Sequence, residues 1–241
     1  MKKEVDDHQR SKSPAKVAVI GYGNEGKEAA SGLRRAGHDV VVGIGVGGMS
    51  WVRAQRDGFR PKPSVMAVDA ADVVALHVPD EEQCSVYWHV VAPHVAGGTL
   101  LVYGRALALA TGAFEPKDLD VVVVTGDASS CRVAVHTDVT GRALDRAIAY
   151  ARAAFGPYAH VGTTTIAAEA EREITALEAG AGGATSLAAE IDRALAHASE
   201  SHAPDEARLA FYEGLREMLA HRAGESAIRF IGGQGARRGV A

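Results

Sequence analysis

The sequence has little of what marks secreted, membrane-spanning or nucleic-acid-binding proteins. Only two cysteines occur among its 241 residues, Cys84 and Cys131, far apart and outside any metal or redox spacing. We therefore expect reduced thiols and a cytoplasmic protein. No apolar run approaches the length of a membrane span, and the first residues lack the apolar core of a signal peptide. A net charge of −4 gives no reason to expect nucleic acid or a membrane as a partner.

The ten histidines form no H-x-x-H or H-E-x-x-H pattern, so we expect no zinc site. Hydrophobic residues make up 47% of the chain and charged residues 23%, which is typical of a globular protein. A chain of this length holds one large or two modest domains and can bury a core.

The clearest motif is KVAVIGYGNEG, from Lys16 to Gly26. It predicts an apolar strand, Val17–Ile20, that runs into a G-x-G-x-x-G turn and then a helix over Lys27–Ala36. In dinucleotide-binding folds the three glycines permit the tight turn, the approach of a pyrophosphate and the packing of helix on strand, and the helix amides face the phosphates. A corner without ligand is the alternative. The predicted cofactor-binding residues here are Gly21, Tyr22, Gly23, Asn24, Glu25 and Gly26.

Two features leave the cofactor open between NAD and NADP. Glu25 places a carboxylate where the phosphates would lie, which is unfavourable unless the side chain points to solvent. The second predicted strand, Asp39–Val42, is followed by a glycine-rich run, Gly43–Gly48. Dinucleotide-binding folds commonly have an acidic residue there for the ribose hydroxyl of NAD, or Arg for the 2′-phosphate of NADP. This run has neither.

Continuous apolar runs alternate with helical patterns up to about residue 160. Such alternation predicts a parallel sheet with both faces covered by helices. Further strands are expected at Asp72–Val78, Thr99–Tyr103 and Leu119–Thr125, with weaker candidates at Val65–Val68 and Arg132–His136. The expected helices are Trp51–Gly58, Glu81–Val91 and Gly141–Phe155.

After about His160 the pattern changes to helices with almost no strand signal. The predicted fold class is therefore α/β, a Rossmann-type parallel sheet domain followed by a small all-helical domain. The expected helices of the second domain are Thr165–Ala179, Thr185–Ser199 and Pro204–Ala223. The predicted divisions are a disordered tail (1–15), a dinucleotide-binding domain (16–160), a helical domain (161–231) and a flexible tail (232–241).

Several segments, in order, resemble the ketol-acid reductoisomerase family. They are IGYGNEG, VVVGIGVGGMSW (Val40–Trp51), VPDEEQ (Val78–Gln83), TTT (Thr163–Thr165) and AFYEGLRE (Ala210–Glu217). The resemblance implies a Rossmann domain with an all-helical dimerisation domain. It also implies NADPH and two magnesium ions, used to rearrange and reduce an acetohydroxy acid in branched-chain amino-acid biosynthesis. Val78 and Pro79, in the third segment, are taken as cofactor-binding.

The chain departs from the family pattern at the cofactor and metal positions. The family's Arg and serines for the 2′-phosphate correspond to Gly45, Gly48 and Ser50, so only Ser50 keeps its hydroxyl as a cofactor-binding candidate. The Asp and Glu of the first metal-binding helix correspond to Arg172 and Ala176, or with a one-residue shift to Glu173 and Leu177. Because neither alignment restores the pair, we expect no magnesium site.

Three residues are candidates for catalysis. Tyr103, at the position of the family's active-site His, ends a predicted central strand, where open α/β sheets bind ligands, and could donate a proton. Glu213 and Glu217 match two glutamates that the family contributes across its dimer interface, and their spacing places them on one helix face. An ordinary solvated face is the alternative for this pair.

Four further polar residues lie at the predicted strand ends. His77 is expected to be a satisfied structural histidine, because its strand is apolar. Thr125, Asp127 and Ser129 share an edge with Tyr103, although Asp127 is equally explained as a turn residue.

The sequence thus favours an NAD(P)-dependent oxidoreductase that reduces a small keto or imine substrate as a homodimer, without the metal-dependent alkyl shift. A non-catalytic module that binds a nucleotide or a partner on the same scaffold is the first alternative. A genuine ketol-acid reductoisomerase is the second.

Overall fold

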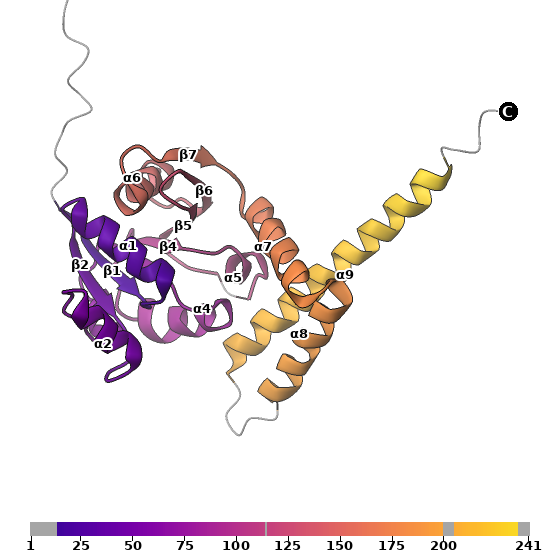
Figure 1. Cartoon of the computed structure of the whole chain (residues 1–241), viewed down its shortest axis with the longest axis horizontal. Helices are drawn as coiled ribbons and strands as arrows, with labels where there is room; N and C mark the ends of the chain where they lie inside the picture. Colours follow the sequence, from indigo (N-terminus) through magenta and orange to yellow (C-terminus); the bar gives the residue numbers. More distant parts are fainter. Residues whose placement is uncertain (1–13, 114, 200–204, 236–241) are drawn as a thin grey trace, which may run out of the picture. The chain divides into compact units, whose positions relative to one another are not determined.

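The computed structural model describes residues 14–113, 115–199 and 205–235 (Figure 1). Most of the two predicted tails, residues 1–13 and 236–241, lies outside the described residues. Two compact units are present. A sheet unit comprises residues up to Val78, Val90–Gly104 and Asp118–Thr163. A helical unit comprises Pro79–His89, Arg105–Lys117 and the chain from Thr164 onward, so it contains two segments that the predicted helical domain omits.

The sheet unit is built on seven strands in the order β2-β1-β3-β4-β5-β6-β7. All neighbouring pairs are parallel except β5 and β6, which form an antiparallel hairpin because a short turn can join only antiparallel strands. The prediction of a Rossmann-type sheet is confirmed, and its parallel pairing holds for every strand pair but this one. The strands are β1 (Lys16–Ile20), β2 (Asp39–Gly43), β3 (Val73–Leu76), β4 (Leu100–Tyr103), β5 (Asp120–Gly126), β6 (Ser130–Thr137) and β7 (His160–Thr163).

Helices flank the sheet and form the second unit. Those of the sheet unit are α1 (Asn24–Arg35), α2 (Met49–Arg56), α3 (Ser64–Val68) and α6 (Ala143–Phe155). After Pro79 the chain forms α4 (Asp80–Val86), which continues as the π-helical turn Tyr87–Val91. Those of the helical unit are α4, α5 (Leu107–Ala110), α7 (Ile166–Ala181), α8 (Ala184–Ser199) and α9 (Glu206–Gly235).

One expected strand was wrong, and one strand of the sheet was not predicted. Residues 65–68 form helix α3, in which Val65 and Met66 are exposed while Ala67 and Val68 are buried. Two adjacent exposed residues followed by two adjacent buried ones do not fit a strand, in which successive side chains point to opposite faces. Pro63 occupies the position before the helix. Conversely, β7 at His160–Thr163 was not predicted, because its four residues carry no continuous apolar run.

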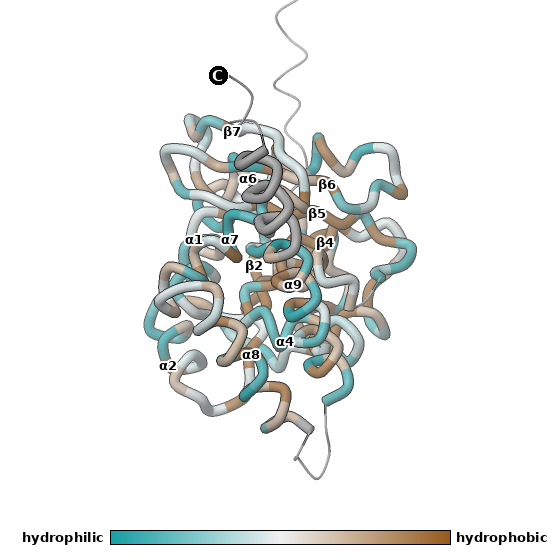
Figure 2. The backbone as a smooth tube through the Cα atoms, turned by 90° about the vertical axis from the view of Figure 1, so that its right-hand side faces the viewer, coloured by the Kyte–Doolittle hydropathy of each residue, from teal (hydrophilic) through white to brown (hydrophobic). Residues whose placement is uncertain are grey.

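The core of the sheet unit lies between the strands and helices α1 and α6. Val17, Val19, Val102 and Val122 from the strands pack with apolar residues of both helices. Figure 2 shows the hydrophobic colouring along β4, β5 and β6. None of the helices in the described part of the chain is long and apolar enough to cross a membrane.

Candidate functional site

The loop after β1 has the geometry of a phosphate-binding turn. A Cβ on Gly21 (φ +93°) would lie 2.3 Å from the His77 carbonyl oxygen, and one on Gly26 would lie 2.4 Å from the Gly21 carbonyl oxygen. Both positions therefore require glycine. Gly23, in contrast, has nothing within 4 Å of its Cβ position, so the middle of the loop is open to a ligand.

Helix α1 begins directly at this open position. Gly23 is its N-cap residue, and no side chain caps the amides of the first turn. A twelve-residue helix presents the positive end of its dipole there. Open space, uncapped amides and two glycines fixed by packing together fit the pyrophosphate of a dinucleotide, which Gly21–Gly26 would hold through their backbone.

The side chain of Tyr22 does not face this open space. It is buried, packs edge-on against Phe59 with ring centroids 5.7 Å apart, and donates a hydrogen bond of 3.0 Å to Asp57. Burial, reinforced by Asp57, raises the pKa of Tyr22 to about 12. Asp57 also pairs with Lys27 of α1 at 3.0 Å. Tyr22 therefore anchors the loop to the end of α2, which leaves only its backbone for a cofactor.

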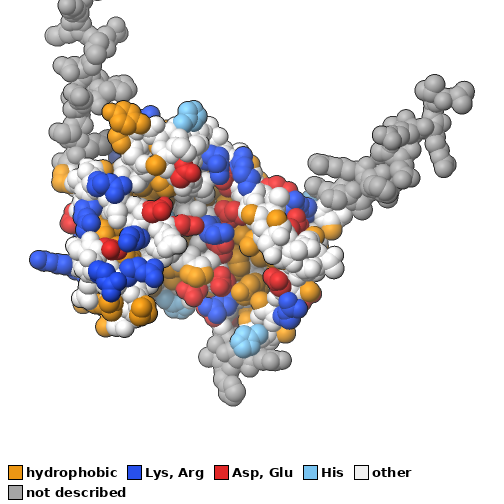
Figure 3. Space-filling view, in the orientation of Figure 1, with side chains coloured by type: hydrophobic (Ala, Val, Ile, Leu, Met, Phe, Trp, Pro, Cys, Tyr) orange, Lys and Arg blue, Asp and Glu red, His pale blue; other side chains and the backbone are white. Residues whose placement is uncertain are grey.

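The loop after β2 is open throughout. Cβ atoms on Gly45, Gly47 or Gly48 would meet nothing within 4 Å. Ser50 lies half-buried in the first turn of α2. Figure 3 shows Lys and Arg side chains gathered over α1 and α2, a positive surface that favours phosphates and that the reading of the loop alone missed. The exposed Lys and Arg residues of these two helices include Lys27, Arg34, Arg53 and Arg56.

His77, directly after β3, lies under the phosphate-binding turn. Both ring nitrogens are buried, and neither has a hydrogen-bond partner among the residues that the structure describes. Burial lowers the pKa of His77 to about 4, so the imidazole is neutral at pH 7. The expectation of a satisfied structural histidine was wrong. The lack of hydrogen-bond partners could not be predicted from the apolar strand, because a partner for the imidazole could come only from segments distant in the sequence.

The carboxylate of Glu25 approaches the end of β4 near His77. A Cβ placed on Gly104 would lie 3.1 Å from His77 Nδ1 and 3.6 Å from Glu25 Oε2. Glu25, His77 and the Tyr103–Gly104 corner therefore meet at the carboxyl edge of the sheet, where open α/β sheets bind ligands. Val78 ends the sheet-unit segment at this edge and Pro79 is the N-cap residue of α4, and their contact with a cofactor stays a prediction.

Tyr103 ends β4 opposite Leu76 of β3 and is fully buried. Its position at the edge matches the prediction, but its hydroxyl has no solvent exposure. A role as proton donor therefore requires a movement that exposes the side chain when a ligand binds.

Asp127 is a turn residue in the β5–β6 hairpin. Its Oδ1 accepts hydrogen bonds from the backbone amides of Ser129 (2.8 Å) and Ser130 (3.1 Å) and from the Ser129 hydroxyl (2.6 Å). These bonds lower the pKa of Asp127. The local turn accounts for both residues, as the alternative reading anticipated for Asp127.

In the helical unit, Glu213 and Glu217 project from the exposed face of α9. The opposite face, with Phe211, Leu215 and Leu219, is buried. Gly214 brings α9 close to α5, because a Cβ there would lie 2.7 Å from the Thr111 carbonyl oxygen. Both readings of the glutamate pair, a shared site and a solvated face, fit this placement.

Glu173 has a structural task that the sequence did not reveal. Its carboxylate accepts hydrogen bonds from the amides of Ala106 (2.8 Å) and Leu107 (3.3 Å) and so caps α5. Burial raises the pKa of Glu173 in spite of these bonds. One turn earlier, Glu169 pairs with Arg172. No group of three His, Cys, Asp or Glu side chains that could hold a metal occurs among the described residues.

Comparison with known proteins agrees with this geometry. The family model "Acetohydroxy acid isomeroreductase, NADPH-binding domain" matches residues 13–159. The ketol-acid reductoisomerase (NADP(+)) of Methanopyrus kandleri is 38% identical over 173 residues, which cover 66% of this chain and 53% of that protein. The enzyme of the same name from Xylella fastidiosa strain Temecula1 is 33% identical over 226 residues, 87% of this chain and 63% of that protein. The chain thus spans between half and two thirds of the length of these curated relatives.

Solved structures give the same grouping. An NADH-preferring ketol-acid reductoisomerase from an uncultured archaeon superposes with a TM-score of 0.64 at 26% identity, over 85% of this chain and 66% of that one. An NAD-binding semialdehyde dehydrogenase protein from Cupriavidus necator, at 20% identity and a TM-score of 0.60, shares the fold. The glycine loop, the sheet order and these matches lead to one conclusion: the chain belongs to the ketol-acid reductoisomerase family.

Proposed function

We propose that the protein is an NAD(P)-dependent oxidoreductase that reduces a small keto or imine substrate. The observation that carries the proposal is the loop after β1, where Gly21 and Gly26 are required by packing while Gly23 and the uncapped start of α1 stay open. Such a turn is suited to a pyrophosphate. The printed names of the curated relatives, which are NADP(+) enzymes, support the same cofactor class.

The chain's own residues have three tasks in this proposal. The loop Gly21–Gly26 binds the pyrophosphate through backbone amides, and the carboxyl ends of β3 and β4 form the floor of the reaction site. A nicotinamide cofactor held there would supply the hydride. Tyr103 supplies the proton once it is exposed, and the neutral imidazole of His77 lies at the same edge to orient polar groups.

The metal-dependent alkyl shift is not part of the proposal. That step needs two divalent ions in a dense carboxylate cluster. Arg172 and Ala176 are not ligands of that kind, and in the shifted alignment Leu177 is apolar and the Glu173 carboxylate caps α5. We expect no two-site magnesium binding at millimolar concentration. Two-site binding in calorimetry with cofactor present would restore the reading as a genuine ketol-acid reductoisomerase.

A homodimer completes the proposed enzyme. The family resemblance places the counterparts of Glu213 and Glu217 across a dimer interface, and both side chains are exposed here. Closed two-fold dimers are the commonest soluble assemblies. Replacing both residues by Gln should impair turnover but leave cofactor affinity and the dimer intact. Normal turnover, or a monomer at micromolar concentration in sedimentation, would return the pair to a solvated helix face.

The test of the proposed function is a titration with NADH and NADPH. Wild type should bind at least one of them, whereas Gly23→Val should lose binding and stay folded, because its side chain fills only the space of the ligand. Gly162→Val is the matched control, since that position in β7 is equally open but lies in another part of the sheet. Equal affinities of wild type and Gly23→Val would overturn the assignment of the loop.

A non-catalytic binding module remains the second candidate, favoured by the carboxylate of Glu25 beside the reaction edge. The two are separated by turnover. Binding of NADH without its oxidation by any of a panel of small 2-oxo acids and cyclic imines would favour the module. Oxidation of NADH by one of them would establish the reductase.

A further inference from the structure

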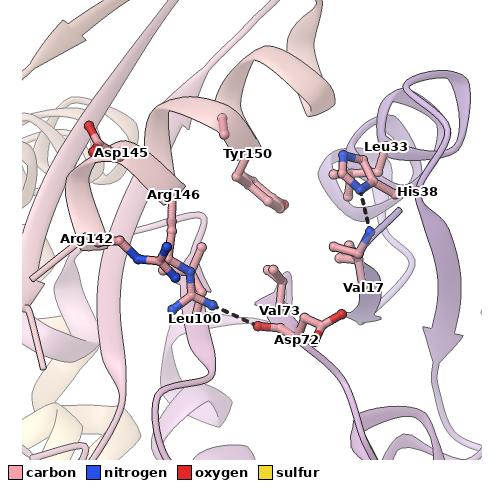
Figure 4. Close-up of a pocket in the computed structure, with 12 residues that line it drawn as sticks. Val17, Leu33, His38, Asp72, Val73, Leu100, Arg142, Asp145, Arg146 and Tyr150 are labelled. Carbon is pink, nitrogen blue, oxygen red and sulfur yellow. Dashed lines mark hydrogen bonds between the residues drawn. The ribbon is translucent and has the colours of Figure 1, made fainter. Parts of the chain in front are cut away.

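A cavity lies at the amino-terminal edge of the sheet, opposite the proposed cofactor loop. It measures about 510 Å³, within the range of roughly 300–1,000 Å³ typical of small-molecule sites (Figure 4). Val17, Val73 and Leu100, which are neighbours in register at the starts of β1, β3 and β4, line it together with residues of α1 and α6. Parallel strands place their carboxyl ends at the other edge, so this cavity is separate from the proposed cofactor loop.

The cavity contains an unsatisfied donor. Tyr150 of α6 is 6% exposed, its ring points into the cavity in Figure 4, and its hydroxyl has no hydrogen-bond partner among the described residues. Burial raises the pKa of Tyr150, so the hydroxyl keeps its proton and can donate. A buried hydroxyl without a partner is unfavourable. An oxygen-bearing ligand would supply the missing acceptor.

One cation at the rim is also free to bind. Arg146 is occupied, because it bonds Asp120 (2.7 Å), the Gly98 carbonyl (2.7 Å) and the Asp72 carbonyl (3.1 Å). The guanidinium of Arg142, the residue before α6, makes no hydrogen bond or ion pair with any residue that the structure describes.

Among the described residues, the acidic groups of the rim form no ion pair with Arg142. Asp72 and Asp145 also line the cavity, and the Asp72 carboxylate accepts a hydrogen bond of 2.8 Å from the Lys16 amide. His38, on the far side of the cavity, accepts the amide of Ala15 at Nδ1. The guanidinium of Arg142 is therefore available to an anion, beside the carboxylates of Asp72 and Asp145.

Arg142 and Tyr150 are eight residues apart along α6, which corresponds to a rise of about 12 Å. The apolar side chains of Leu33, Val73 and Leu100 also line the cavity. We propose that the cavity binds a small monocarboxylic acid whose hydrocarbon chain carries a hydroxyl or carbonyl oxygen remote from the carboxylate. Arg142 binds the carboxylate, the apolar side chains cover the chain, and Tyr150 donates to the remote oxygen.

Calorimetry on the full chain with two probes, hexanoate and 6-hydroxyhexanoate, tests each contact. Both acids should bind saturably, and 6-hydroxyhexanoate more tightly. Arg142→Ala should weaken both by about tenfold, the loss of a charge-assisted bond. Tyr150→Phe, which keeps the buried ring, should abolish the difference between the probes. Arg152→Ala, an exposed arginine of α6 outside the cavity, is the control and should change neither affinity.

Four results would overturn the proposal. They are no saturable binding of either acid, binding of 1-hexanol as tight as that of hexanoate, affinities unchanged by Arg142→Ala in a variant with the wild-type melting temperature, and displacement of the acids by NADH. The last would place the acids at the cofactor edge. Because NADH binding is measured separately, failure here leaves the proposed function intact.

Discussion

The two glycine-rich loops of the sheet unit contain glycine for different reasons. In the loop Gly21–Gly26, a Cβ on the first or last glycine would collide with backbone oxygen atoms of His77 or of Gly21 itself. In the loop Gly45–Gly48, Cβ atoms on Gly45, Gly47 and Gly48 would meet nothing, and Gly47 alone of these has a positive φ, +78°. The first loop is therefore fixed by its packing on β3. The second loop has room for side chains, so residues other than glycine can be accommodated there to suit a particular ligand.

The largest expected effect comes from breaking the packing of the first loop. Gly21→Ala forces a positive φ on alanine and a 2.3 Å contact with the His77 carbonyl oxygen, so it should lower the free energy of unfolding by about 3–5 kcal/mol. Gly45→Ala, in open space, should change it by less than about 0.5 kcal/mol. Urea unfolding of both variants measures the contrast. Similar losses in the two variants would contradict the distinction between the loops.

The second effect concerns His77, whose backbone closes the first loop. Its pKa is about 4 in the folded chain and 6.5 ordinarily, so between these pH values the unfolded chain binds a proton that the folded chain does not. Protonation of His77 in the unfolded chain therefore lowers the free energy of unfolding. This loss is absent above about pH 6.5 and grows as the pH falls toward 4. At about 1.4 kcal/mol per pKa unit, the loss is on the order of 3 kcal/mol.

Unfolding of wild type and His77→Leu at pH 7 and pH 4.5 isolates this contribution, because other groups titrate equally in both chains. The leucine variant should lose less stability on acidification. Exposed His160 provides the control, since His160→Gln should retain the wild-type pH dependence. Equal acid sensitivity of wild type and His77→Leu would show that His77 is solvated in the folded protein.

The same comparison explains how far the sequence could predict the molecule. The strands β1 to β5 were predicted because their apolar runs are continuous, and the first loop because glycines required by packing recur at fixed spacing. The structure of residues 64–68 could not be predicted from four apolar residues, which suit a strand or a helix turn equally. Only the burial of Ala67 and Val68, side by side, distinguishes them.

The polar contacts of the site were harder to predict than the fold. Glu173 caps a helix 66 residues earlier in the chain, and His77 lacks partners that no local pattern specifies. The cavity at Tyr150 arises where three strand starts meet α6. Each depends on segments brought together only by folding. A single sequence therefore indicates where ligands bind along the loops, but not which side chains are left to bind them.

The third effect sharpens the comparison in the open loop. Wild type should prefer NADPH over NADH only weakly, since Ser50 alone retains a hydroxyl at the 2′-phosphate positions. Gly45→Arg combined with Gly48→Ser should shift the ratio of dissociation constants toward NADPH by at least about tenfold, the effect of a charge-assisted bond of about 1.5–3 kcal/mol. Fluorescence titrations with both cofactors measure the ratio. A hundredfold preference of wild type for NADPH would contradict the interpretation that the loop Gly45–Gly48 offers the 2′-phosphate little binding. The basic surface over α1 and α2 would then account for the preference.

The smallest effect tests the one charge that the first loop places beside a cofactor. Glu25 lies in the first turn of α1, and its carboxylate reaches the end of β4 instead of capping the loop amides. A unit charge about 8 Å from a phosphate in a solvated site is repelled by about 0.5 kcal/mol. With two phosphates, Glu25→Gln should tighten the binding of NADH and NADPH alike by about two- to fivefold.

The control for this prediction is Glu28→Gln, one turn further along the exposed face of α1, which makes the same change in net charge and should have less effect. Raising the salt concentration to about 1 M, where the Debye length falls to about 3 Å, should remove the gain if it is electrostatic. Weaker binding by Glu25→Gln would instead mean that the carboxylate accepts a hydrogen bond from the cofactor, as acidic residues do with ribose hydroxyls in this fold. Glu25 would then be a ligand of the cofactor and not an obstacle to it.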